Sequence, residues 1–140
     1  GRFCTKPSEF LFFDVLSQIA RGMKTITLTA QGEVWRRYVD AGDYLETCVL
    51  ASLEALCGSI DSTGDLIEAE DLVHQAAQIC GCEVQISRPN RQNSASNSFY
   101  LSSNPAMESA MKELGIRRFT LDQQIRLGFL DTNLGCGPTK

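Results

Sequence analysis

Apolar side chains recur at intervals of three or four residues in five stretches of the chain. This spacing gathers them on one face of a helix, so each stretch predicts an amphipathic helix. Proline at an early position, as at Pro7 and Pro105, and glycine beyond the last apolar residue, as at Gly22 and Gly81, mark helix ends. The helices are predicted at about residues 7–21, 44–57, 68–80, 105–114 and 120–127.

The polar residues near several helix starts also have interpretable spacing. Asp43 with Glu46, and Thr120 with Gln123, match the capping box. The helix at 44–57 is expected to form an apolar face composed of Leu45, Cys48, Val49, Leu53 and Leu56. An acidic run precedes and opens the third helix, where the helix dipole favours carboxylates, and is interpreted as a solvated first turn; it consists of Asp61, Asp65, Glu68, Glu70 and Asp71.

Between the helices, polar and apolar residues alternate with period two. Residues 25–29 and 35–40 alternate on either side of a turn-like segment, which predicts a β-hairpin. Further short strands are predicted at 59–62, 82–87 and 99–101, with a turn at 63–65. Residues 89–98 are polar and lack periodicity, so we expect a mobile loop there, and a frayed tail over 132–140.

This succession of helices and short strands predicts a mixed α/β (α+β) fold. The 140 residues fit a single domain spanning 1–140, with a core formed by about residues 7–130. With 13 basic and 17 acidic residues and no basic block, a nucleic-acid partner is not expected. No apolar stretch approaches the roughly 20 residues of a membrane span, so no membrane partner is expected and the protein is predicted to be soluble.

Six cysteines are too few for a secreted disulfide scaffold of this length, which favours a reduced, cytoplasmic protein. Cys80 and Cys82 lie near His74, but no second pair completes a zinc site, so no metal ligand is predicted. The chain begins at Gly1 rather than methionine, which leaves open whether it is complete, processed or a fragment.

Motifs of catalytic sites are not found. There is one histidine, no serine nucleophile elbow and no glycine-rich phosphate loop, so no catalytic residue is predicted. The arginines are more informative, because Arg36 and Arg37 lie in one alternating segment and Arg88 ends another. Two guanidinium groups at neighbouring strand ends could hold a diphosphate through bidentate bonds, or could form surface salt bridges.

A longer pattern contains these arginines. It runs from Gly22 through Thr25-Ile-Thr-Leu-Thr29, Gly32 and Arg36-Arg-Tyr38-Val39 to Asp43 and Cys48. This pattern resembles the signature of NAD-dependent nucleotide-sugar epimerases and dehydratases of the extended short-chain dehydrogenase class. Later segments continue the resemblance in the family's order over about residues 7–130, namely Asp61-Ser-Thr-Gly64, Arg88-Pro89, Tyr100 to Ser103, Lys112-Glu-Leu-Gly115 and Thr120-Leu-Asp.

The resemblance implies the small C-terminal, substrate-binding lobe of such an enzyme, and a nucleotide-sugar ligand. By the family pattern, Arg36 and Arg88 would clasp the nucleotide diphosphate, Tyr38 would belong to the same site, and the strand residues Thr27 and Leu28 would lie along the base. Three departures leave the base and the sugar undetermined: Arg37 replaces an aspartate, Gly42 the first of two aspartates, and Ile116 a tryptophan.

The cofactor half of the family is not found in this sequence. Its glycine-rich turn is missing, and Tyr38, Tyr44 and Tyr100 are not followed four residues later by the lysine of the catalytic Tyr-x-x-x-Lys pair. The resemblance therefore implies no cofactor on this chain and no Rossmann domain, with NAD expected on a separate or missing N-terminal lobe. Two interpretations follow: an incomplete lobe that is inactive alone, or a stand-alone binding or protein-interaction module that self-associates through an apolar surface.

Overall fold

The computed structural model describes residues 10–54, 64–92, 96–99 and 105–134. This part of the chain contains five helices and five short strands, which confirms the predicted mixed fold. The helices are α1 (Leu11–Ala20), α2 (Ala41–Leu53), α3 (Ala69–Cys80), α4 (Ala106–Glu113) and α5 (Leu121–Leu134). The strands are β1 (Thr25–Thr27), β2 (Val34–Tyr38), β3 (Asp65–Glu68), β4 (Gln85–Ser87) and β5 (Ser98–Phe99). None of the described helices is long and apolar enough to cross a membrane.

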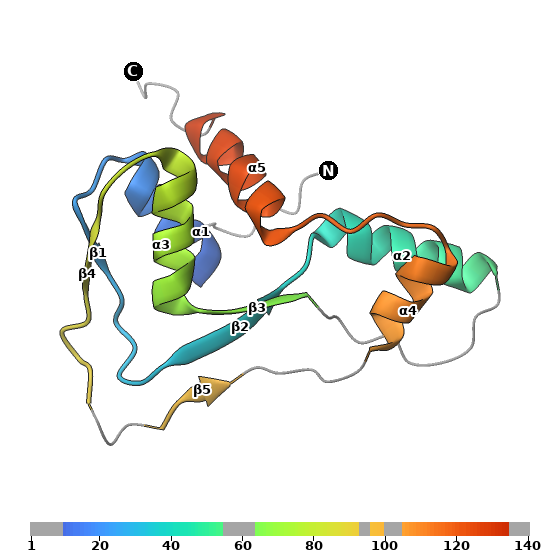
Figure 1. Ribbon diagram of the computed structural model, residues 1–140, viewed down its shortest axis with the longest axis horizontal. Coiled ribbons are helices and arrows are strands. Elements are labelled where there is room, and N and C mark those ends of the chain that lie inside the picture. Colours follow the sequence, from blue (N-terminus) through green and yellow to red (C-terminus); the bar gives the residue numbers. More distant parts are fainter. Residues whose placement is uncertain (1–9, 55–63, 93–95, 100–104, 135–140) are drawn as a thin grey trace.

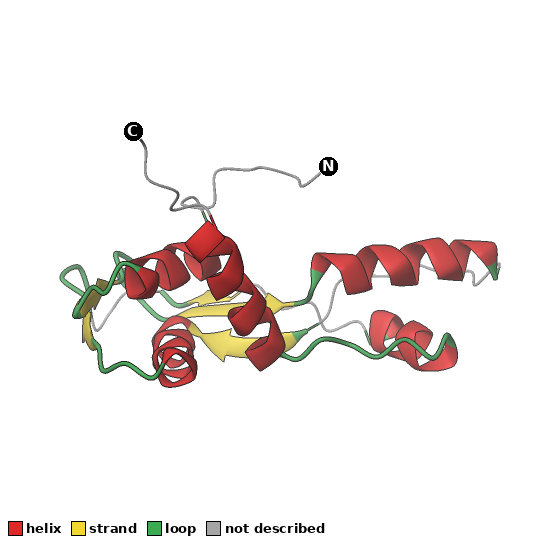
Figure 2. Ribbon diagram, turned by 90° about the horizontal axis from the view of Figure 1, so that it is seen from above, coloured by secondary structure: helices red, strands yellow, loops and turns green. Residues whose placement is uncertain are grey.

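The strands form two small sheets. β1 pairs with β4 in parallel, with Ile26 opposite Ile86. In the second sheet, β2 lies between antiparallel β3 and parallel β5. Helices α1, α3 and α5 gather on one side of the molecule, while α2 and α4 project from it side by side (Figures 1 and 2).

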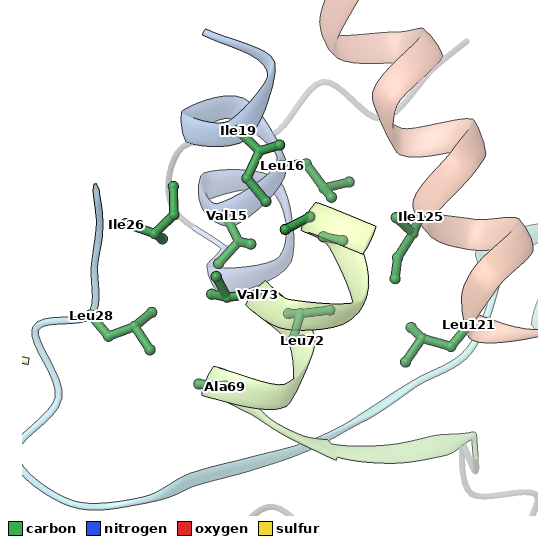
Figure 3. Packing of buried hydrophobic residues seen from close by; sticks show 12 residues of the cluster. Val15, Leu16, Ile19, Ile26, Leu28, Ala69, Leu72, Val73, Leu121 and Ile125 are labelled. Atoms are coloured by element: carbon green, nitrogen blue, oxygen red, sulfur yellow. The ribbon is translucent and has the colours of Figure 1, made fainter. Parts of the chain in front are cut away.

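The core lies where α1, α3 and α5 meet β1 (Figure 3). Val15, Leu16, Leu72, Val73 and Ile125 are fully buried there. They come from the predicted apolar faces, because helical spacing places each of them on the side that faces the neighbouring helices. Glycine permits the closest approach: a Cβ on Gly128 would lie 2.4 Å from a methyl carbon of Leu16, so α5 packs directly against α1.

The predicted hairpin is wrong. β1 and β2 belong to different sheets, and the residues between them carry the chain from one sheet to the other. Leu28 continues the pairing with β4 by donating its N–H to the Ser87 carbonyl at 2.9 Å. Alternation identified both strands but does not specify which strands pair.

The interpretation of the acidic run as a solvated first turn is wrong for Asp65 and Glu68, whereas Glu70 and Asp71 do lie in the first turn of α3, where Asp71 is exposed. Asp65 to Glu68 form β3, where a turn and the start of a helix were predicted. Glu68 is buried and caps α3, and Asp65 forms an ion pair with Arg118 at 2.8 Å. Pairing with β2 overrides the low strand preference of acidic residues. The strand predicted at 59–62 lies outside the described residues.

Helix α2 begins earlier than predicted, and its cap differs. Asp40 accepts hydrogen bonds from the N–H groups of Gly42 and Asp43, so the proposed Asp43–Glu46 capping box is wrong. Asp43 instead is buried and accepts a 2.6 Å bond from the Phe119 N–H. The second predicted capping box is confirmed: Thr120 N–H bonds to Gln123, and Gln123 N–H bonds to Thr120.

Candidate functional site

A hollow of about 370 Å³ lies between the segment that follows β1 and the segment that enters β5. Its walls are formed by Thr29, Ala30, Gln31, Gly32, Glu33, Val34, Ser96 and Ser98. The two walls approach closely, because a Cβ on Gly32 would lie 2.7 Å from the Ser96 carbonyl oxygen. Glycine at position 32 therefore lets the backbones of the two wall segments approach each other closely.

Arg36, on β2, contacts one wall residue of this hollow, Ser98. Its Nη1 donates to the carbonyl oxygens of Trp35 at 2.8 Å and Ser98 at 3.1 Å, and its Nη2 donates to the Ser98 hydroxyl at 3.0 Å. These acceptors are all neutral, and no carboxylate among the described residues forms an ion pair with Arg36. Its positive charge is therefore not neutralised by the protein surface that the structure describes.

Arg88, which follows β4, contacts Gly32 in the opposite wall. Its Nη1 donates to the Gly32 carbonyl at 3.3 Å. Its Nη2 forms a 2.6 Å ion pair with Glu68, and its Nε lies 2.8 Å from Glu70. The side chain of Arg88 is only 4% exposed. Two carboxylates thus neutralise Arg88, and its contact to a diphosphate stays a prediction.

Glu68 is the residue that organises this side of the site. One of its oxygens accepts from Arg88 and from the Val34 N–H at 2.9 Å, and the other from the Glu70 N–H at 2.6 Å. Burial raises the pKa of this carboxyl, but the three donors favour the charged form more strongly and hold the pKa below its ordinary value. Glu68 therefore remains an anion that fixes Arg88.

The other predicted site residues face elsewhere. The ring of Tyr38 lies 5.2 Å from that of Phe12 and lines a second hollow of about 320 Å³ between α1, α5 and the start of α2. Burial raises the pKa of Tyr38 to about 12, against the opposing effect of Arg36. Leu28 is buried in the core, and Thr27 is exposed on β1. Arg36 and Arg88 thus each contact a wall residue of one hollow, Ser98 and Gly32, whereas the other three do not.

Two residues of this site were not identified from the sequence. Ser98 lies in the polar loop, where no periodicity distinguishes it, and its contact with Arg36 comes from the parallel pairing of β5 with β2. Glu68 was noted as a member of the acidic run but was interpreted as solvated, because its partner Arg88 lies 20 positions away along the chain. The described residues hold no group of three His, Cys, Asp or Glu side chains that could bind a metal ion.

Comparison with solved structures identifies where this fold occurs. The chain matches RMD from Pseudomonas aeruginosa complexed with NADPH, with a TM-score of 0.67, 17% identity and coverage of 91% of this chain and 44% of that chain. It also matches a "putative epimerase" from Burkholderia cenocepacia J2315, with a TM-score of 0.67, 16% identity and coverage of 91% and 42%.

These matches confirm the predicted fold, because the same fold occurs as part of both longer structures. The chain spans less than half the length of either matched structure. No protein-family model and no curated protein matches the sequence.

Proposed function

We propose that this chain is the nucleotide-sugar-binding lobe of an NAD-dependent epimerase or dehydratase, and that it is inactive without a cofactor-binding lobe. The observation that carries the proposal is the position of Arg36, which bonds to the Ser98 wall of the hollow and has no carboxylate partner among the described residues. The fold supports the proposal, because it occurs in structures more than twice as long, one of which is complexed with NADPH.

The hollow offers suitable chemistry for a diphosphate. Arg36 exchanges its bonds to the Ser98 carbonyl and hydroxyl for phosphate oxygens, which are stronger, charged acceptors. Ser98 is then free to donate its hydroxyl to the same phosphate. Arg88, fixed by Glu68, holds the Gly32 wall in place. The base lies along the backbone that continues from β1.

The residues present do not fit a nicotinamide cofactor. Tyr38 and Tyr44 are followed by Gly42 and Cys48 rather than lysine, and the ring of Tyr38 is enclosed beside Phe12. Hydride chemistry therefore requires residues from another lobe, and we expect no conversion of a nucleotide sugar by this chain alone. Detection of NAD-dependent turnover by the purified chain would refute this part of the proposal.

Calorimetric titration tests the binding site. Nucleoside diphosphates and nucleoside-diphosphate sugars with different bases are titrated at low salt into wild type, Arg36→Ala and Arg117→Ala. We expect Arg36→Ala to weaken binding about tenfold or more, because a charge-assisted bond contributes about 1.5–3 kcal/mol. Arg117 is exposed outside the hollow, and its variant is the matched control. Equal affinity of all three proteins, or no binding by wild type, would overturn the assignment.

A second candidate function is that of a stand-alone binding or interaction module. It is favoured by one observation: Leu45, Val49 and Leu53 of α2 are 54%, 57% and 74% exposed and share one helix face. The mass of the native gene product in its source cells distinguishes the two. A species more than twice the 15.4 kDa of this chain supports the enzyme lobe, whereas a species of that mass supports the module.

A further inference from the structure

Two cysteines flank a single glycine at the end of α3. Cys80 is the last residue of the helix, and Cys82 follows after a single glycine. Gly81 adopts the left-handed conformation with φ 72° and ψ 30°, which glycine accepts without steric cost. The Cys82 N–H donates to the Ala77 carbonyl at 3.0 Å, so this turn is held in place.

The turn brings the two thiols together. Cys82 lies near enough to raise the pKa of the Cys80 thiol, and neither cysteine forms a disulfide in this structure. Two residues that flank a tight turn have Cα atoms about 5–6 Å apart, within the range a disulfide requires. Cys80 is exposed and Cys82 is half-buried, so a small reagent can reach the pair from solvent.

The surroundings supply charge on both sides of the pair. Cys82 borders a hollow of about 670 Å³ together with Lys24, His74 and Glu83. Cys80 borders a second hollow of about 390 Å³ together with Arg126. Burial and the neighbouring Cys82 raise the pKa of Cys80, so its thiol is protonated near neutral pH and its reaction is faster in alkaline solution.

We propose that Cys80 and Cys82 form a reversible dithiol–disulfide site that reacts with low-molecular-weight disulfides. The Cys80 thiolate attacks one sulfur of the small disulfide, forming a mixed disulfide and releasing one thiolate. The Cys82 thiolate then attacks the Cys80 sulfur, the internal S–S bond forms, and the second thiolate leaves. Two electrons pass to the small disulfide, and its two thiolates take up the protons that the cysteines lose. The site is separate from the proposed nucleotide site, so either can fail without the other.

Equilibration of the full chain with oxidised and reduced glutathione tests the site. After alkylation, cleavage at glutamate releases residues 71–83, which contain Cys80 and Cys82 and no other cysteine. We expect the oxidised peptide to be lighter by two hydrogen atoms and to escape alkylation. The ratio of oxidised to reduced peptide should be proportional to the concentration of oxidised glutathione divided by the square of that of reduced glutathione. Oxidation is expected at lower ratios in the folded chain than in urea, because the fold holds the thiols together.

Serine variants test whether the disulfide forms between Cys80 and Cys82. Cys80→Ser and Cys82→Ser each retain one thiol of the pair, so their peptides are expected to stop at the mixed disulfide with glutathione. Cys48→Ser, which alters a cysteine on α2, is the matched control and is expected to behave like wild type. Wild-type peptide that stays alkylated at every ratio, or that carries glutathione without forming the internal bond, would overturn the proposal.

Discussion

At the scale of single residues, Glu68 links three elements that are distant in sequence. It caps α3, accepts the Val34 N–H of β2 and holds Arg88 beyond β4. A buried carboxylate with this many donors is stabilised as the anion. Substitution of Glu68 affects the helix start, the strand and the arginine together, so we expect it to destabilise the fold more than the loss of an exposed salt bridge would.

Glu68→Gln is therefore expected to lower the free energy of unfolding by about 2 kcal/mol at pH 7. The pKa of Glu68 is lower in the folded than in the unfolded protein. Its stabilisation is thus complete above the ordinary glutamate value of about 4.3 and is lost as the pH falls through the folded-state pKa. Urea unfolding should be measured from pH 7 into the acid range. The free energy of unfolding should fall less steeply with decreasing pH for the variant than for wild type. Glu83→Gln, at an exposed position, is the control, and parallel pH profiles of wild type and Glu68→Gln would contradict the assignment.

Part of the arginine site could be predicted from the sequence. Arg36 and Arg88 were predicted to converge, and both contact walls of one hollow. The sequence could not show that Glu68 and Glu70 neutralise Arg88 while Arg36 has only neutral partners, because these contacts depend on strand pairing. Gly64 illustrates the same limit. Its φ is 153°, and a Cβ there would lie 2.1 Å from the Tyr38 carbonyl oxygen, a contact created by the pairing of β2 with β3.

At the scale of elements, the positions of the helices were predicted better than the pairing of the strands. Helical periodicity is a local property, and all five helices overlap their predicted positions. Helix α5, however, continues to Leu134, so its predicted end near residue 127 and the frayed tail from residue 132 are wrong for the residues up to 134. The strands are two to five residues long, so their partners are chosen by tertiary contacts that alternation does not encode. Helix α2 shows a further failure: its apolar residues Leu45, Val49 and Leu53 face solvent, while Asp43, Thr47 and Ala51 are buried.

We expect this exposed face of α2 to cause self-association of the chain. Val49→Glu places a charge at its centre and removes little buried surface, so the free energy of unfolding should change by no more than about 0.5 kcal/mol. Sedimentation velocity at increasing concentration should show association for wild type and its loss in the variant. Glu46→Gln, on the same helix but off the apolar face, is the control and should associate like wild type. A monodisperse wild-type monomer at all concentrations would contradict this expectation.

At the scale of the whole molecule, the chain packs as two units of unequal size. The larger hydrophobic cluster joins α1, α3, α5 and β1, whereas α2 and α4 contact each other outside it (Figure 1). The buried residues Ala51, Met107, Ala110 and Met111 lie on these two helices and are not part of the larger cluster. The bond from the Phe119 N–H to Asp43 connects the two units.

This division predicts two levels of stability. A small cluster buries less apolar surface, so α2 and α4 should open locally at lower free energy than α3. Hydrogen exchange followed by mass spectrometry should show faster exchange in α2 and α4. Met107→Ala removes a fully buried side chain, a change that costs about 2–5 kcal/mol, and should accelerate exchange in those two helices while α3 stays protected. Leu72→Ala, in the larger cluster, should accelerate exchange everywhere. Equal acceleration of exchange in α3 by Met107→Ala would mean that the molecule unfolds as one unit, which would contradict the prediction of two levels of stability.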